Sequence, residues 1–162
     1  MSIWRRLFAV PAPPRLKPAL GRLYVFDDDN IVHVYKITCA EFNVYTAEAL
    51  HWLTLYVAAD LKIEPNDNMN PEPFLEVNLY FQDSPEALLE AGVVLKVTSY
   101  HEEHFNLASM YYWTHSPFDG GVHVEAFEED VLTARVEGES DNDPVVLRAK
   151  FQRNPERKRS FI

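Results

Sequence analysis

The chain has 162 residues, 47% of them hydrophobic and 13% aromatic, with a formal net charge of −10 and one cysteine. A chain of this size is most simply one domain, and it buries roughly 70% of its unfolded surface without a disulfide or a metal. The single cysteine, Cys39, excludes an intramolecular disulfide framework; we expect it to be a small buried side chain in a reducing compartment. No segment approaches the ~20 apolar residues of a membrane span, and the N-terminus lacks the apolar run of a signal peptide, so the sequence predicts a cytoplasmic protein.

The charges divide the chain into three parts. Residues 1–22 carry five basic residues and no acid, and residues 148–162 carry six basic residues against one acid. The 125 residues between them hold 24 acids and four basic residues. Such a body repels nucleic acid and anionic membranes and attracts basic partners. We therefore predict a basic, proline-rich arm, one acidic β-domain and a basic tail, over residues 1–21, 22–152 and 153–162.

The N-terminal arm combines a short apolar face with a proline-rich extended segment. Trp4, Leu7 and Phe8 lie at helical spacing beside two arginines, and prolines at positions 11, 13, 14 and 18 then impose an extended conformation. A single short turn with two arginines is a weak membrane anchor. The arm is therefore expected to pack on the body, to be disordered, or to dock a partner through the three apolar side chains.

From residue 22 onward, the apolar period is two, which is typical of strands. Clusters of Asp, Asn and Pro separate the apolar runs and favour turns. The predicted strands cover residues 23–26, 31–39, 52–63, 74–81, 93–100, 105–113, 121–127, 131–137 and 145–151.

Helical signals are few. Thr46 is a candidate cap for a short helix or turn near 46–50. The clearest helix is 84–91, where Ser84 caps, Pro85 takes the first helical position and Gly92 ends the segment. Many short strands with little helix predict a mainly β fold: an antiparallel β-sandwich, or a strongly curved sheet or open barrel, with an extended N-terminal arm.

Two histidines frame the segment 101–104, where His101 and His104 flank a pair of glutamates. The spacing differs from the His-Glu-x-x-His zinc motif, and the segment lies between two predicted strands. A turn there could still bring the two imidazoles together, and His115 or His123 could join them from neighbouring strands. A solvated turn, a transition-metal site and an acid–base site are the alternatives.

Acidic turns form a second candidate site, at residues 27–29, 66–68, 128–130 and 141–143. Clustered carboxylates would bind Ca²⁺, but no segment follows the twelve-residue calcium-loop pattern. Alternate hairpin turns also lie at opposite ends of a sheet. We therefore expect solubilising turns and no cofactor, with contact to a basic partner as the alternative.

Aromatic residues and the basic tail complete the list of features. Tyr112 and Trp113 follow Tyr111 directly, so alternation sends one of the three to the opposite face, where it is covered or serves as an interface anchor. The tail is expected to fold back on the acidic body or to fray.

Taken together, these features predict a non-enzymatic interaction module, most concretely an inhibitor or immunity-type protein for a basic partner. The sequence has no nucleophile elbow, phosphate-binding glycine loop or Cys-x-x-Cys pair, which disfavours several enzyme classes. Two alternatives stay open: a ligand- or metal-binding β-domain, enzymatic or not, that uses His101 and His104, and an accessory subunit that docks through the arm. The predicted contact residues are Asp27, Asp28, Asp29, Tyr112, Trp113, Glu128, Glu129 and Asp130.

Overall fold

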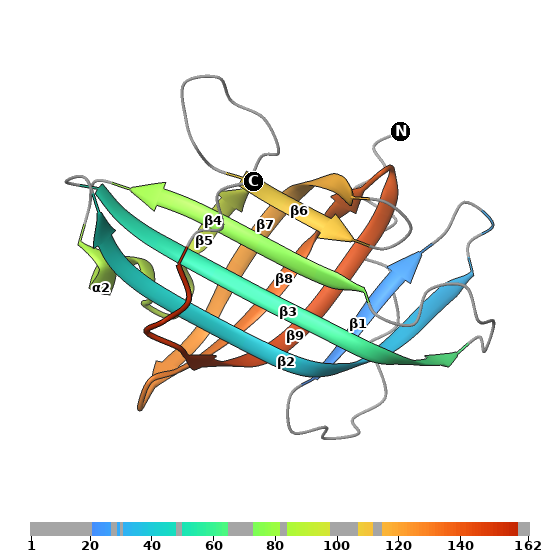
Figure 1. Ribbon diagram of the computed structural model, residues 1–162, viewed down its shortest axis with the longest axis horizontal. Coiled ribbons are helices and arrows are strands. Elements are labelled where there is room, and N and C mark those ends of the chain that lie inside the picture. The colour runs from blue at the N-terminus through green and yellow to red at the C-terminus, as the bar shows by residue number, and fades with distance from the viewer. Residues whose placement is uncertain are drawn as a thin grey trace.

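The computed structural model describes residues 21–26, 29, 31–47, 50–64, 73–81, 84–97, 107–111 and 115–158. Within these ranges, nearly all residues form antiparallel strands of one strongly curved sheet (Figure 1), which confirms the mainly β prediction. One short helix, α2, is present at Pro85–Leu88, shorter than predicted. The strands are β1 (Gly21–Phe26), β2 (Val32–Ala47), β3 (Leu50–Glu64), β4 (Phe74–Phe81), β5 (Val94–Val97), β6 (Leu107–Tyr111), β7 (His115–Glu128), β8 (Val131–Ser140) and β9 (Asp143–Arg153).

The strands form a meander that returns to its start. The order is β5-β7-β6-β4-β3-β2-β1-β9-β8, and a further β7–β8 pairing joins its two ends. β5 and β6 pair with successive segments of β7, so they share one position in the sheet. The result is one sheet nearly closed into a barrel, rather than two stacked sheets.

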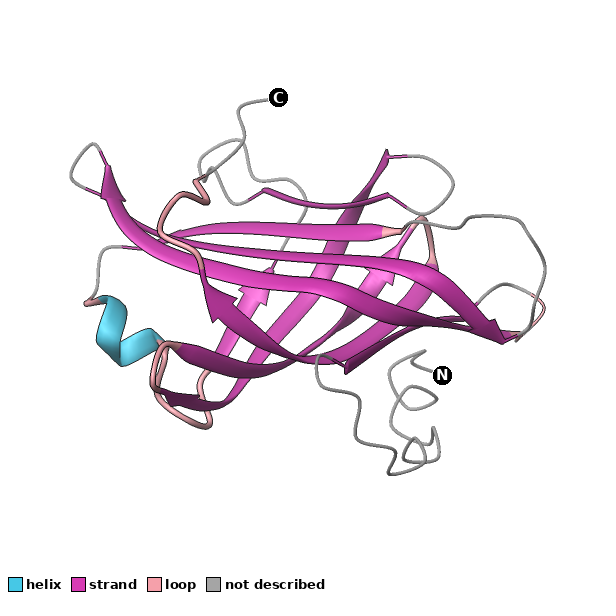
Figure 2. Cartoon of the chain, turned by 60° about the horizontal axis from the view of Figure 1, so that its bottom comes forward, coloured by secondary structure: helices cyan, strands magenta, loops and turns pink. Residues whose placement is uncertain are grey.

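The interior of the curved sheet is a packed core. Alternate residues of each strand point inward, and the largest fully buried side chains include Tyr35, Phe42, Phe118 and Phe151. A barrel of about eight strands is just wide enough for side chains to fill. At one end of the sheet, α2 covers the opening and Leu89 joins the core cluster (Figure 2).

A bulge in β2 explains the largest error in the predicted strands. The prediction ended this strand at Cys39, whereas it continues to Ala47, and the helix alternative near 46–50 is wrong. The β2–β3 register shifts around Thr38, and the buried positions change from Ile37 to Ala40. A bulge adds one residue to a strand and so reverses which residues point inward after it. The second half of this strand therefore does not continue the period of the first half.

β7 also starts earlier than predicted, at His115 rather than at residue 121. Its first half contains Pro117, Gly120 and Gly121, which are poor strand formers. Gly120 lies opposite Gly138 of β8, and a Cβ on either glycine would overlap backbone atoms of the other strand. The two glycines therefore allow an unusually close approach of β7 and β8.

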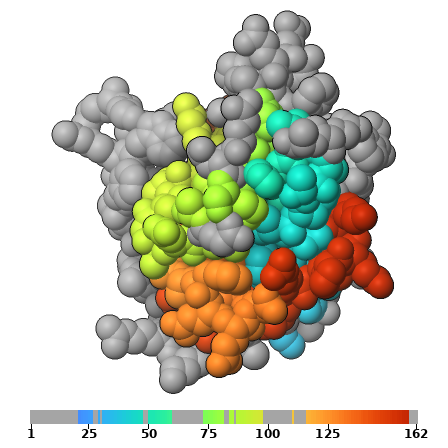
Figure 3. Space-filling model, turned by 90° about the vertical axis from the view of Figure 1, so that its left-hand side faces the viewer, coloured from blue at the N-terminus to red at the C-terminus, as the bar shows by residue number. Residues whose placement is uncertain are grey.

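The beginning of the basic tail folds back on the body. Beyond β9, the backbone N–H of Asn154 donates a hydrogen bond of 2.8 Å to the carbonyl of Phe42 in β2. The side chain of Asn43 then donates to carbonyls of the tail. We call residues 154–158 the strap; Figure 3 shows the red C-terminal segment beside the teal β2–β3 strands and the orange β7–β8 strands.

Candidate functional site

The β8–β9 turn gathers carboxylates at the end of the sheet opposite α2. Asp141 and Asn142 form this turn with φ values of 54° and 69°, a left-handed conformation that Asp and Asn tolerate better than most residues. β1 lies beside β9, with Val25 opposite Val145. The exposed Asp29, in the turn that follows β1, therefore lies at the same end.

Two carboxylates of this end face each other across a strand pair. Asp119 of β7 lies directly opposite Glu139 of β8 in the antiparallel register. The neighbouring Gly120–Gly138 pair brings these two backbones close together. Like charges directly opposite each other on adjacent strands are destabilising. This end therefore places two acidic side chains directly opposite each other.

The middle of the same outer face is neutralised by ion pairs. Glu137 contacts both Arg135 at 2.6 Å and His123 at 3.0 Å, and Glu125 contacts Arg148 at 2.7 Å. Nearer the β8–β9 turn, the strand register places Asp119 and Glu139 directly opposite each other. The group that we call the acidic end consists of Asp29, Asp119, Glu139, Asp141 and Asp143.

The predicted contact residues of the β7–β8 turn lie at the other end of the sheet. Glu128, Glu129 and Asp130 are exposed, and Asp130 Oδ1 accepts a 2.9 Å hydrogen bond from Arg153. The ten residues of β8 separate this turn from the β8–β9 turn, a length of about 33 Å. Asp29 and this turn therefore do not share one compact surface.

A hollow of about 290 Å³ lies next to the β7–β8 turn. It is lined by Ala126, Glu128, Glu129, Val131, Thr133, Lys150 and Gln152. Its volume is at the lower limit of small-molecule sites, and its lining is mostly polar rather than apolar and aromatic. We assign no ligand to it.

The strap provides the most elaborate polar contacts on the outside of the sheet. The guanidinium of Arg157 contacts Glu41 Oε2 through both Nε and Nη2, each at 2.7 Å. Its Cζ lies 4.0 Å from the centroid of the Tyr56 ring, a cation–π contact. Burial would raise the pKa of Glu41, but hydrogen bonds from Arg157 and Asn154, the Arg157 charge and the Cys39 thiol together lower it below its ordinary value.

Cys39 lies beside this site and is half-buried, rather than fully buried as expected. Burial raises the pKa of its thiol, and the nearby carboxylate of Glu41 raises it further. A raised pKa keeps the thiol protonated, so Cys39 has the opposite of the environment that activates a nucleophile.

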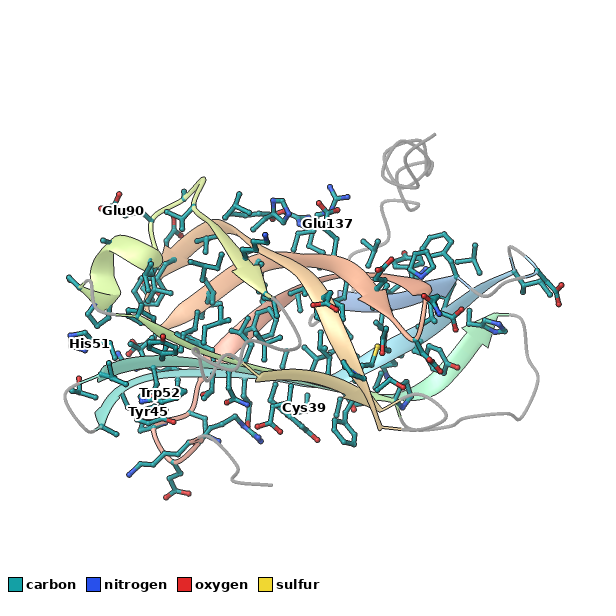
Figure 4. All side chains as sticks on the ribbon, turned by 90° about the horizontal axis from the view of Figure 1, so that it is seen from above. Cys39, Tyr45, His51, Trp52, Glu90 and Glu137 are labelled. Carbon is teal, nitrogen blue, oxygen red and sulfur yellow. The ribbon has the colours of Figure 1, made fainter. Side chains whose placement is uncertain are left out.

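An aromatic row crosses the outer face of β2, β3 and β4. The ring of Trp52 lies 6.5 Å from that of Tyr45 and 5.8 Å from that of Tyr80, centroid to centroid. Trp52 is nevertheless only 7% exposed, so the row belongs to a covered face. Figure 4 shows Tyr45 and Trp52 on the same side of the sheet as Cys39 and away from Glu137. The sequence alone does not reveal this row, because its members come from three strands whose register it does not give.

The candidate histidine site is not tested by the structure, because His101 and His104 lie outside the described residues. His115 and His123 both belong to β7, which pairs with both β5 and β6. Eight residues of strand separate them by about 26 Å, too far to share a metal ion. Among the side chains that the structure describes, no group of three or more His, Cys, Asp or Glu could hold a metal.

The remaining predicted site residues lie outside the described residues and stay predictions. They are Trp4, Leu7, Phe8, Asp27, Asp28, His101, His104, Tyr112 and Trp113.

Comparisons with protein-family models, with curated proteins and with solved structures gave no match. Across the described ranges, no helix is long and apolar enough to cross a membrane. Function must therefore be inferred from the chemistry of the chain's own surfaces.

Proposed function

We propose that this protein is a non-enzymatic interaction module that binds a basic protein through the acidic end. The observation that carries the proposal is the direct opposition of Asp119 and Glu139. Acidic side chains gathered at one end of the sheet would attract a basic partner. Complementary charge of this kind accelerates association and selects the partner.

The packed interior supports a binding role on the outside of the sheet. Bulky side chains such as Phe42, Phe118 and Phe151 occupy the space that a small ligand would need. The most concrete form of the proposal is an inhibitor or immunity-type protein that covers a basic surface of a toxin or nuclease. A rigid sheet that presents charged turns suits this role because little ordering accompanies binding.

Quantitative co-purification from the native cells tests the proposal. Wild-type protein should recover a basic partner, and the Glu139→Lys/Asp141→Lys double variant should lower its recovery by about tenfold or more. The matched control is Glu128→Lys/Glu129→Lys, which changes the charge equally at the opposite end and should retain the partner. Association with the identified partner should also slow steeply as salt is raised.

Two outcomes would contradict the proposal. Recovery of the partner would be unaffected by the acidic-end variant, or the recovered partner would be acidic. Unfolding curves of each variant show whether a loss of recovery comes from loss of the folded state.

A further inference from the structure

Three features of the strap site point beyond simple packing of a chain end. The first is the geometry around Arg157, whose planar guanidinium is held at its edge by Glu41 and on its face by Tyr56. Two N–H groups converge on one carboxylate oxygen while the ring covers the plane. A lysine ammonium cannot reproduce this combination, because it is a point charge without a planar fork.

The second feature is the buried amide of Asn43. Its Nδ2 donates to the carbonyl of Pro155 at 3.2 Å and to the carbonyl of Arg157 at 2.7 Å. Asn43 is only 3% exposed although it points to the outer face. A buried amide that donates to main-chain carbonyls recognises backbone shape rather than side-chain identity.

The third feature is the shape of the bound segment. The backbone N–H of Arg157 donates to the carbonyl of Asn154 at 3.0 Å, which closes a turn. The side chain of Asn154 accepts a hydrogen bond of 3.1 Å from the N–H of Glu156. Asn followed by Pro is a strong turn signal. The segment is therefore preorganised, with its arginine at the fourth position of the turn.

The side chains between these anchors are not recognised. Pro155 and Glu156 are exposed, as is Lys158. The body thus contacts Asn154, the arginine and two carbonyls, and leaves the side chains of Pro155 and Glu156 in solvent. This pattern is that of a peptide-recognition site with one anchor residue and a tolerant backbone contact.

We propose that Glu41, Asn43 and Tyr56 form a recognition site for an arginine-bearing β-turn of a partner protein, and that the chain's own strap occupies this site in the free protein. The partner's turn enters by displacing the strap. The chain's own segment shows which chemistry the site accepts, and the Glu41 carboxylate supplies the complementary charge. The site lies on a different face from the acidic end and does not depend on the proposed function.

The tether makes the strap a strong competitor. A segment attached by a short linker has an effective concentration in the millimolar range. A free peptide of micromolar affinity would therefore bind the wild-type chain far more weakly than a chain whose own arginine is removed. This difference is the measurable signature of occupation by the strap.

Fluorescence anisotropy with a labelled Asn-Pro-Glu-Arg-Lys peptide tests the proposal on the full chain. Arg157→Ala should bind the peptide at least about tenfold more tightly than the wild type, because the strap then no longer competes for Glu41 and Tyr56. A peptide with lysine in place of arginine should bind about tenfold more weakly. Unfolding curves establish that the variant is folded, and Arg157→Gln replaces it if it is not.

Matched variants distinguish recognition of the peptide at this site from a general attraction of the basic peptide to acidic surfaces. In the Arg157→Ala background, Glu41→Gln should abolish binding of the peptide, whereas Glu139→Gln should leave it unchanged. The proposal is overturned if the vacated site does not bind the peptide, or if both charge removals weaken binding equally. It is also overturned if the wild type is a dimer that dissociates on Arg157→Ala, because the occupant would then be the strap of a second copy.

Discussion

The acidic end and the strap site both place carboxylates on outward-facing strand positions, but their neighbours differ in sign. Glu139 lies directly opposite Asp119, another acid, in the β7–β8 register. Glu41 lies against Arg157, which comes from the same chain's tail. One region thus joins a carboxylate to a basic residue from a distant part of the chain, and the other places two acids opposite each other on adjacent strands.

The substitution with the largest expected effect on stability is one that separates β7 from β8 at the acidic end. In Gly138→Ala, the added methyl group would overlap the carbonyl of Asp119 and the Phe118 ring. We expect the free energy of unfolding to fall by more than about 2 kcal/mol, measured by chemical denaturation. Gly121→Ala is the control, since its nearest neighbour would be 3.5 Å away, and it should change stability by less than about 0.5 kcal/mol. Equal effects of the two substitutions would refute the close approach.

Removing the Arg157 side chain from the strap site should lower stability less than Gly138→Ala does. Arg157→Ala removes the ion pair with Glu41 and the cation–π contact with Tyr56. The expected loss in the free energy of unfolding is about 1–2 kcal/mol. The neighbouring, exposed Lys158 gives the control, because Lys158→Ala should stay within about 0.5 kcal/mol of the wild type. An unchanged stability of Arg157→Ala would mean that the strap does not contribute to folding.

The contribution of the strap site to stability should also depend on pH through the Glu41 carboxylate, and Glu41→Gln should remove that dependence. The folded-state pKa of Glu41 is lowered from its ordinary value of 4.5. Its charge therefore stabilises the fold above that value, and the contribution disappears as the pH falls through the lower folded-state pKa. The difference in unfolding free energy between wild type and Glu41→Gln should shrink as the pH is lowered from about 5 to about 3. A difference that stays constant over this range would contradict the assignment.

The part of the fold that sequence could predict is the part where the apolar period is unbroken. The strand at 74–81 was predicted with the bounds that β4 has, because Leu75, Val77 and Leu79 alternate without interruption. The second half of β2 was missed because the bulge at Thr38 inverts the alternation. The start of β7 was missed because Gly120 signals a turn in sequence but a close backbone contact in the sheet.

The candidate surface sites were harder to predict from the sequence than the strands were. Acidic turns were recognised individually, yet which turns share an end depends on strand register. The pair of Asp119 and Glu139 is 20 positions apart and becomes visible only through the β7–β8 pairing. Likewise, Glu41 and Arg157 are 116 residues apart, and only the way in which β9 returns to β2 brings them together.

Double-mutant cycles on the two charge pairs test the account most directly. One cycle combines Asp119→Asn with Glu139→Gln, and the other combines Glu41→Gln with Arg157→Ala, with unfolding free energies measured at low salt. The account predicts couplings of opposite sign, each about 0.2–1 kcal/mol: unfavourable between Asp119 and Glu139, and favourable between Glu41 and Arg157. A zero or favourable coupling between Asp119 and Glu139 would contradict the prediction that these two acids repel each other.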